Sequence, residues 1–111
     1  MSDSEEKFRG IIENVLNTDF PKKRPKWLIN EQGNRLELDG YNEELKIAFE
    51  YQGRGHFEKV SDFGGEKALI KNQLHDEIKR KTCKEMSILL LEPDYKMCEG
   101  DFYKMIKNIE R

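Results

Sequence analysis

Three segments of the chain carry apolar residues at the spacing of an amphipathic helix. A helix is predicted over Ser4–Leu16, with Ser4 as its N-cap and acidic residues in its first turn. A long helix is predicted over Glu66–Met86, and a last one opens after Gly100 with Asp101 as its cap. The apolar residues that these helices would bury are Phe8, Ile11, Ile12, Val15 and Leu16, then Leu69, Ile70, Leu74, Ile78 and Met86, and finally Phe102, Met105, Ile106 and Ile109.

Shorter segments between the first two helices predict three strands, joined by polar turns into an antiparallel meander. The strands are Trp27–Asn30, Arg35–Tyr41 and Leu45–Gln52, and the turns are Glu31–Asn34 and Asn42–Glu44. The third strand alternates clearly, so that one face is apolar and the other carries polar residues. The two faces are Leu45, Ile47, Phe49 and Tyr51, and Lys46, Ala48, Glu50 and Gln52.

A continuous apolar run, Ile88–Leu91, follows the long helix and ends at Glu92 and Pro93. This composition is typical of a strand that is covered on both faces. Because a helix precedes it, the strand is expected to lie parallel to the third strand and beside it. The predicted order is therefore helix, three-strand meander, helix, strand and helix, which is an α/β fold.

Composition adds bounds on the class of protein. Residues 1–111 have the length of one domain, and 38% charged with 36% hydrophobic residues is a globular balance. The net charge of −2 argues against a protein that coats nucleic acid by bulk charge, although local basic patches still count. We expect no membrane partner, because no apolar run approaches about 18 residues and no signal peptide is evident. An intracellular location follows, with Cys83 and Cys98 as free thiols.

Two carboxylates on neighbouring predicted strands, Asp39 and Glu50, are candidates for a divalent-metal site. They must converge to share a cation. If a simple turn were centred on residues 42 and 43, Asp39 would face a residue four positions short of Glu50, roughly 13 Å away at ~3.3 Å per residue. A shared metal therefore predicts an asymmetric turn, or a bulge or bend near Gly40.

Polar residues around this pair have candidate roles in hydrolysis. Gln52 cannot abstract a proton, but it can orient a water or donate to a phosphate oxygen. Lys79, on the long helix, could hold charge on the phosphate, or be a surface lysine near a helix end. His56, in the loop 53–65, could act as a general acid or phosphate donor, or be a bystander.

A compact basic segment follows Pro21, includes Pro25 and ends before Trp27. It predicts contact with a phosphate backbone. Trp27 would either stack on a base or pack in the core. Arg54 in the loop and Arg80 in the basic end of the long helix belong to the same predicted nucleic-acid contact set. The cations of the basic segment are Lys22, Lys23, Arg24 and Lys26.

In order and spacing, these elements resemble the PD-(D/E)xK nuclease superfamily, most closely its compact branch near the very-short-patch-repair endonucleases and archaeal Holliday-junction resolvases. The resemblance covers most of the chain. Its segments are Glu13, RPKWL (24–28), LELDGY (36–41), FEYQGRGHF (49–57), HDEIKRKTC (75–83) and ILLLEP (88–93).

The resemblance implies a restriction-endonuclease-like core in which Asp39 and Glu50 hold Mg²⁺ or Mn²⁺. It makes Glu13 an outer or water-mediated ligand. Two positions depart from the family pattern, since Gln52 stands where the family has a lysine and Leu38 where it has a proline.

The resemblance also raises His56 as an auxiliary catalytic residue and pairs Asp76 with Lys79. Together these features predict a metal-dependent DNA endonuclease that selects structure or reads sequence weakly. The alternatives are a DNA-binding module of the same fold that has lost catalysis, an RNA endonuclease, and an interaction domain whose acids are a solvated strand face. A homodimer is a further alternative, since a resolvase needs a symmetric dimer and nothing in the sequence identifies a dimer face.

Overall fold

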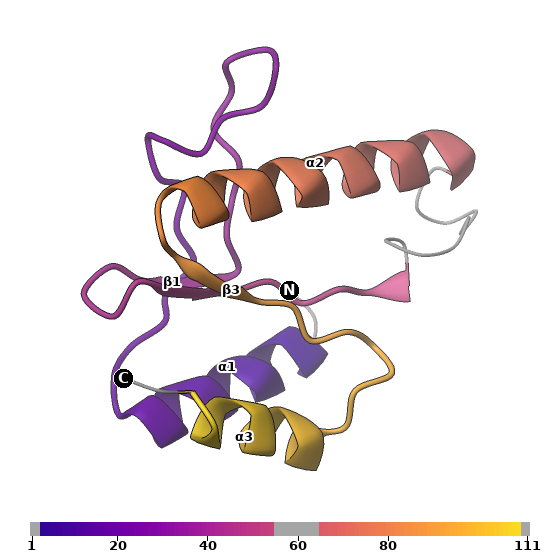
Figure 1. Ribbon diagram of the computed structural model, residues 1–111. Helices are drawn as coiled ribbons and strands as arrows, with labels where there is room; N and C mark the ends of the chain where they lie inside the picture. The colour runs from indigo at the N-terminus through magenta and orange to yellow at the C-terminus, as the bar shows by residue number, and fades with distance from the viewer. Residues whose placement is uncertain (1–2, 55–64, 110–111) are drawn as a thin grey trace.

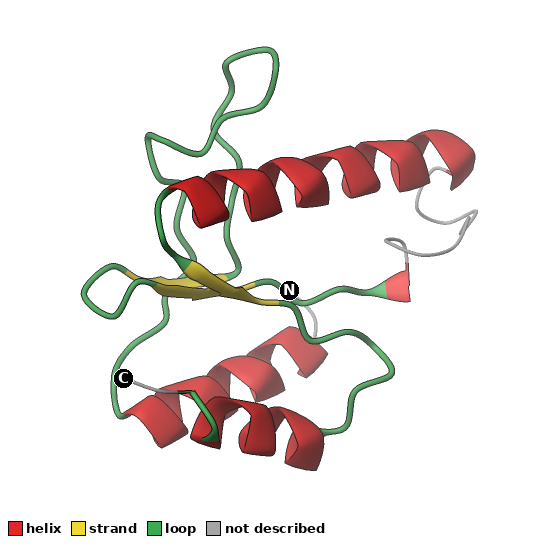
Figure 2. Ribbon diagram, viewed as in Figure 1, coloured by secondary structure: helices red, strands yellow, loops and turns green. Residues whose placement is uncertain are grey.

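A small sheet lies between two layers of helix (Figures 1 and 2). The computed structural model describes residues 3–54 and 65–109. Helix α2 covers one face of the sheet, and helices α1 and α3 lie side by side on the other. The elements are α1 (Asp3–Leu16), β1 (Gly40–Asn42), β2 (Ile47–Phe49), α2 (Gly65–Glu85), β3 (Leu89–Leu91) and α3 (Glu99–Lys107).

The sheet is mixed, with strand order β1-β2-β3. Strand β1 pairs antiparallel with β2, and β3 pairs parallel with β2 on the other side. The predicted parallel strand after the long helix is therefore confirmed, and the chain has the expected mixed α/β class.

The predicted three-strand meander is wrong in its first member. Trp27–Asn30 is not a strand, and only an isolated bridge between Ile29 and Arg35 remains of its pairing. A tight turn, in which the Leu28 amide donates to the Pro25 carbonyl over 3.2 Å, interrupts extended backbone at this point. The predicted strand Arg35–Tyr41 is likewise reduced to β1 and isolated bridges.

The hairpin between β1 and β2 has a longer turn than the predicted Asn42–Glu44. Residues 43–46 form the turn, and the ladder pairs Gly40 with Phe49. The Asn42 Oδ1 atom accepts a hydrogen bond of 2.8 Å from the Leu45 amide, and Lys46 adopts a left-handed conformation with φ 56°. The turn is thus centred two residues further along the chain, which shifts the register of the pair by four residues.

Two apolar clusters fill the space between the layers, one on each face of the sheet. The alternation predicted for β2 is confirmed, because Ile47 and Phe49 pack toward α1 and α3 while Ala48 packs toward α2. The buried residues of the first cluster are Phe8, Ile12, Leu16, Phe20, Ile47, Phe49, Leu91, Phe102 and Ile106. Those of the second are Leu28, Leu36, Leu38, Tyr41, Ala48, Cys83 and Ile88.

The face that α2 buries matches the predicted one only in part, since Ile78 packs against the second cluster but Ile70 and Leu74 do not. Ile70 is 58% exposed and Leu74 is 41% exposed, whereas Asp76 and Cys83 are buried. Beside the second cluster α2 also meets Glu50, which follows β2 in the chain, and it therefore turns Lys79 inward as well. No helix within the described ranges is long and apolar enough to cross a membrane.

Smaller differences concern the ends of the helices. Helix α3 begins one residue after its N-cap, Cys98, so Asp101 lies within the first turn and is not the cap. Ser4 lies inside α1. Cys83 and Cys98 are free thiols, as expected.

Candidate active site

Asp39 and Glu50 converge because of the turn that separates β1 from β2. The ladder pairs Gly40 with Phe49, so the next pair beyond it sets Asp39 opposite Glu50. Directly opposed residues have Cα atoms about 4.5–5.5 Å apart. A simple turn would instead have left Asp39 and Glu50 roughly 13 Å apart. The expected asymmetric turn is not what brings them together, because the four-residue turn pairs Asn42 with Ile47 evenly and is simply centred two residues later.

Reciprocal hydrogen bonds hold the two side chains in place. The Asp39 amide donates to Glu50 Oε1 over 2.8 Å, and the Tyr51 amide donates to Asp39 Oδ2 over 2.8 Å. Each carboxylate thus accepts a backbone donor from the opposite strand and keeps another oxygen for other contacts. Backbone donors at this range fix a carboxylate more firmly than flexible side chains do.

Lys79 reaches this pair from the middle of α2. Its Nζ atom lies 2.8 Å from Glu50 Oε2, and the two side chains are 12% and 5% exposed. Lys79 is therefore a buried partner of Glu50 rather than a solvated lysine at a helix end. It brings one positive charge to two carboxylates.

Burial perturbs both acids. Loss of solvent raises the pKa of Glu50 to about 7, the charge of Asp39 adds to the rise, and Lys79 opposes it. The pKa of Asp39 is also raised, first by burial and further by Glu5, while the Tyr51 amide, Lys79 and Lys22 lower it. At both carboxylates, burial raises the pKa by more than the neighbouring cations lower it. A further cation bound here would therefore stabilise the ionised form of both acids.

Gln52 lies on the same face of the sheet and is 3% exposed. Its Nε2 atom donates to Glu92 Oε1 over 3.0 Å, and Arg80 Nε contacts both Glu92 oxygens at 2.9 and 2.8 Å. A carboxylate only accepts, so Glu92 fixes which end of the amide is the nitrogen. The Gln52 Oε1 atom is buried and has no hydrogen-bond partner among the described residues. Sequence reasoning missed Glu92, whose signal was its place at the end of the apolar run.

The glutamate of α1 near Asp39 is Glu5, whereas sequence reasoning singled out Glu13. Glu13 Oε2 accepts a hydrogen bond of 2.8 Å from the Phe20 amide and so holds the segment that leaves the helix. Glu5 is buried, and its charge reaches Asp39 strongly enough to raise the pKa of that acid. The first turn of α1, rather than its last, faces the carboxylate pair.

Arg9 connects Glu5 to the hairpin. Its Nη2 atom lies 3.2 Å from Glu5 Oε2 and 2.6 Å from the Asp39 carbonyl, and Nη1 donates to the Phe20 carbonyl. The spacing of Glu5 and Arg9, four residues apart in a helix, was the signal available in the sequence. Arg9 positions the backbone that carries Asp39.

The predicted phosphate-contacting cations fall into two groups. Lys22 lies 3.2 Å from Glu5 and 3.6 Å from Glu37, and Arg24 lies 3.3 Å from Glu37. The structure holds Arg80 against Glu92, and Arg54 is exposed at the end of the first described range. Within the described ranges, Lys23 and Lys26 are exposed and form no ion pair with an acid, so their ammonium groups are accessible to a ligand.

The donor set determines which cation these residues suit. The two carboxylates are hard oxygen donors, which fit Mg²⁺ or Mn²⁺. No group of three His, Cys, Asp or Glu side chains among residues 3–54 and 65–109 is arranged to hold a metal ion. A Mg²⁺ ion is commonly held by one or two carboxylates together with water and substrate phosphate, so the pair is a sufficient protein contribution. His56 lies outside the described residues.

Relatives of the chain occur in viruses. It is 40% identical over 103 residues to the uncharacterized protein 094L of Frog virus 3 (isolate Goorha), which covers 88% of this chain and 66% of that protein. It is 33% identical over 108 residues to the uncharacterized protein 033L of Invertebrate iridescent virus 3, covering 91% of this chain. The chain spans 55% of the length of 033L, so both relatives are longer than the segment they share with it.

Protein-family models give no match to the chain. No solved structure matches it either.

Proposed function

We propose that the chain is a divalent-cation-dependent endonuclease that hydrolyses phosphodiester bonds of DNA. The observation that carries the proposal is the buried pair Asp39 and Glu50 with Lys79 against it. Burying two carboxylates and an ammonium costs several kcal/mol per ion, so such a cluster is weak as a stabilising device. Perturbed acids gathered on a rigid sheet are typical of catalytic sites.

Asp39 and Glu50 would hold Mg²⁺ or Mn²⁺, and the cation would supply Lewis-acid activation of water and charge compensation for the phosphate. The Gln52 carbonyl accepts a hydrogen bond from the attacking water and orients it, because Glu92 already occupies the amide nitrogen. Lys79 opposes the rise in the pKa of Glu50 and places a positive charge where the phosphate gains negative charge. His56 remains a predicted auxiliary acid.

Basic residues beside the pair support nucleic acid as the substrate class. Lys22 lies close enough to lower the pKa of Asp39, and the exposed Lys23 and Lys26 continue the positive segment away from it. Such cations contact a phosphate backbone without reading sequence. This composition favours structure-selective or weakly specific cleavage.

A binding module that has lost catalysis is the second candidate, and the uncharged Gln52 in the place of a family lysine favours it. Lys79 favours retained catalysis, since this residue of α2 brings to Glu50 the ammonium group that Gln52 lacks. An RNA endonuclease would use the same site. Cleavage assays separate these candidates.

The test is incubation of purified protein with supercoiled plasmid, branched DNA and single-stranded RNA, in Mg²⁺, Mn²⁺ or EDTA. We expect DNA nicking that needs the cation and is lost in Glu50→Ala and Asp39→Asn. Binding without cleavage in every condition would favour the inactive module, and cleavage of RNA alone would assign the other nuclease class. Cleavage that survives in Glu50→Ala would eliminate the proposed site.

Glu5→Gln tests the role of the α1 acid, with Glu99→Gln as its matched control. Glu99 is an exposed acid in the first turn of α3, as Glu5 is an acid of the first turn of α1. We expect Glu5→Gln to weaken cation dependence, because it removes a charge that acts on Asp39. Equal activity in the two variants would restrict the site to the hairpin and α2.

A further inference from the structure

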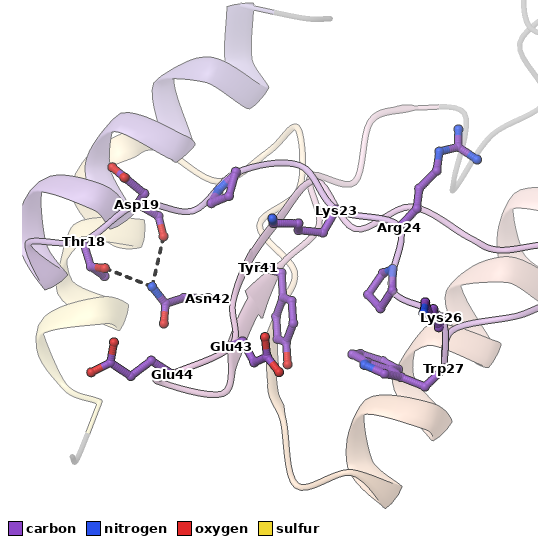
Figure 3. Close-up of a pocket in the computed structure, with 12 residues that line it drawn as sticks. Thr18, Asp19, Lys23, Arg24, Lys26, Trp27, Tyr41, Asn42, Glu43 and Glu44 are labelled. Atoms are coloured by element: carbon purple, nitrogen blue, oxygen red, sulfur yellow. Dashed lines mark hydrogen bonds between the residues drawn. The ribbon is translucent and has the colours of Figure 1, made fainter.

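A cavity of about 660 Å³ lies between the basic segment and the β1–β2 hairpin (Figure 3). Its volume lies in the range of roughly 300–1,000 Å³ that small-molecule sites occupy. The cavity has an aromatic wall made by Trp27 and Tyr41, cations from the segment 23–26, and acids from the hairpin turn. None of these residues belongs to the carboxylate site described above.

Hydrogen bonds hold the frame of the cavity in place. The Tyr41 amide donates to the Pro21 carbonyl over 3.0 Å. The Asn42 side chain donates to Thr18 Oγ1 over 2.9 Å and to the Asp19 carbonyl over 3.1 Å, as the dashed lines in Figure 3 show. The segment that carries the cations is thus tied to the hairpin that carries the acids, and the cavity is formed before any ligand enters.

The aromatic wall suits a flat ligand. The Trp27 and Tyr41 rings meet edge to face, with centroids 5.7 Å apart and an interplanar angle of 80°. Tyr41 is buried in the core beneath α2, whereas Trp27 is only half-buried and keeps part of its surface accessible. Tyr41 supports the Trp27 ring from one side, so that a base can stack on what remains open.

Charge is divided across the cavity. Lys23 and Lys26 stand on one wall, and Glu43 stands on the other beside Tyr41. Burial raises the pKa of the Tyr41 hydroxyl, and the charge of Glu43 adds to the rise. A nucleotide has the same division, with an anionic phosphate at one end and hydrogen-bond donors on the edge of its base. The cavity therefore suits a nucleotide in volume and in the distribution of charge.

The cavity is also next to the carboxylate pair. Tyr41 and Asp39 are two residues apart on one extended segment, so they lie on the same side of it, about 7 Å apart. Lys22 and Lys23 are neighbours in the segment opposite, and Lys22 contacts Glu5 while Lys23 lines the cavity. A strand that places one base in the cavity would bring its sugar–phosphate backbone toward Asp39.

We propose that this cavity binds one unpaired nucleobase of a nucleic-acid strand, stacked on Trp27, and so selects substrates with an extruded or single-stranded nucleotide at the cleavage position. The link to cleavage rests on the proposed function, whereas binding of the base does not. Unpaired bases require less energy to place in a pocket than paired ones, which gives such a site selectivity for irregular DNA.

The test measures binding in EDTA, so that cleavage cannot interfere. Three labelled duplexes are compared, which are fully paired, carry one bulged adenine, or carry one bulged abasic sugar. We expect the bulged adenine to bind more tightly than the abasic bulge by roughly 5- to 150-fold, the value of one base–aromatic stack. Trp27 is the only tryptophan of the chain, so its emission reports on the cavity directly and should be quenched by the adenine bulge alone.

Variants assign the preference to the cavity. Trp27→Leu should remove the difference between adenine and abasic bulges, and Trp27→Phe should keep most of it. Tyr103→Leu is the matched aromatic control, because Tyr103 is an exposed tyrosine on α3 beside Lys107. If Trp27→Leu does not fold, the comparison of the two bulges in the unaltered chain and in Trp27→Phe still decides.

Equal affinity for adenine and abasic bulges, or a preference that survives in Trp27→Leu, would overturn the proposal. Adenosine monophosphate, added alone, separates a nucleotide site from one that needs a whole strand. Competition by the free nucleotide supports the cavity as a nucleotide site, and its absence with a retained bulge preference assigns the site to bases in a strand. Base binding in a chain that never cleaves DNA would refute the nuclease and leave this inference standing.

Discussion

Replacing Glu50 with glutamine should shift the stability of the protein, relative to the unaltered chain, progressively in favour of the variant as the pH rises from 4.5 to 8. Burial raises the pKa of Glu50 in the folded chain to about 7, from its ordinary value of 4.5. Because this pKa is raised on folding, the folded state binds more protons between these two values. The stabilising contribution is therefore complete below about pH 4.5 and is lost as pH rises through about 7.

The magnitude follows from the size of the shift. At about 1.36 kcal/mol per pKa unit, the ionised Glu50 costs about 3 kcal/mol of unfolding free energy once the pH exceeds 8. Glu50→Gln has the shape of the protonated acid and does not titrate. Its effect on the hydrogen bonds from Asp39 and Lys79 is the same at every pH and adds only a constant.

The assay is equilibrium unfolding in urea, followed by the emission of Trp27, between pH 4.5 and pH 8. The quantity of interest is the difference in unfolding free energy between Glu50→Gln and the unaltered chain. We expect this difference to rise by about 3 kcal/mol across the range, in favour of the variant. Glu99→Gln, at an exposed position in α3, controls for a general effect of removing an acid.

Divalent cations should reverse the effect in the unaltered chain only. A cation at one hundred times its dissociation constant stabilises the folded state by about 2.7 kcal/mol, and Glu50→Gln removes one of the two carboxylates that would hold it. A difference curve that is flat from pH 4.5 to pH 8, or that slopes the other way, would refute the account of Glu50 as a buried acid with a raised pKa.

Two further predictions use residues around the same site. Lys79→Met removes the cation that lowers the pKa of Glu50, so we expect the pKa of Glu50 to rise further. In a nicking assay, DNA cleavage should fall at least tenfold, and the remaining activity should shift to higher pH. An unchanged pH profile would contradict this. Gly40→Ala would set a Cβ atom 2.1 Å from the Phe49 ring, which must shift. We expect a loss of about 1–3 kcal/mol in urea unfolding, whereas Gly100→Ala, with open space around it inside a helix, should be neutral or stabilising. Equal stability of the two alanine variants would show that the Gly40 contact relaxes freely.

Local pattern was sufficient for most of the elements. The periodicity of 3.6 residues placed the three helices within a few residues of their observed ends, and the run Ile88–Leu91 marked the parallel strand after α2. Alternation in residues 45–52 assigned Ile47 and Phe49 to one side of the sheet and Ala48 to the other. These features depend on side-chain direction along a single element, which the order of residues dictates.

Contacts between elements could not be read in this way. The apolar stripe of α2 predicted a buried face that includes Ile70, but the helix packs Lys79 and Cys83 toward the sheet, because the strand beneath it presents Glu50 and Gln52. A hydrophobic pattern counts the apolar residues of one helix and contains no information about the surface that the helix will meet.

The carboxylate pair shows most clearly what each level decided. The sequence by itself identified Asp39 and Glu50 as candidate partners and showed that a simple turn would keep them apart. Only the tertiary structure decided the turn at residues 43–46. In this turn Asn42 Oδ1 accepts a hydrogen bond from the Leu45 amide, and Lys46 takes a left-handed conformation. It also replaced Glu13 with Glu5 as the acid near Asp39, because the packing of α1 against the hairpin, and not the spacing within α1, determines which turn of the helix meets the site.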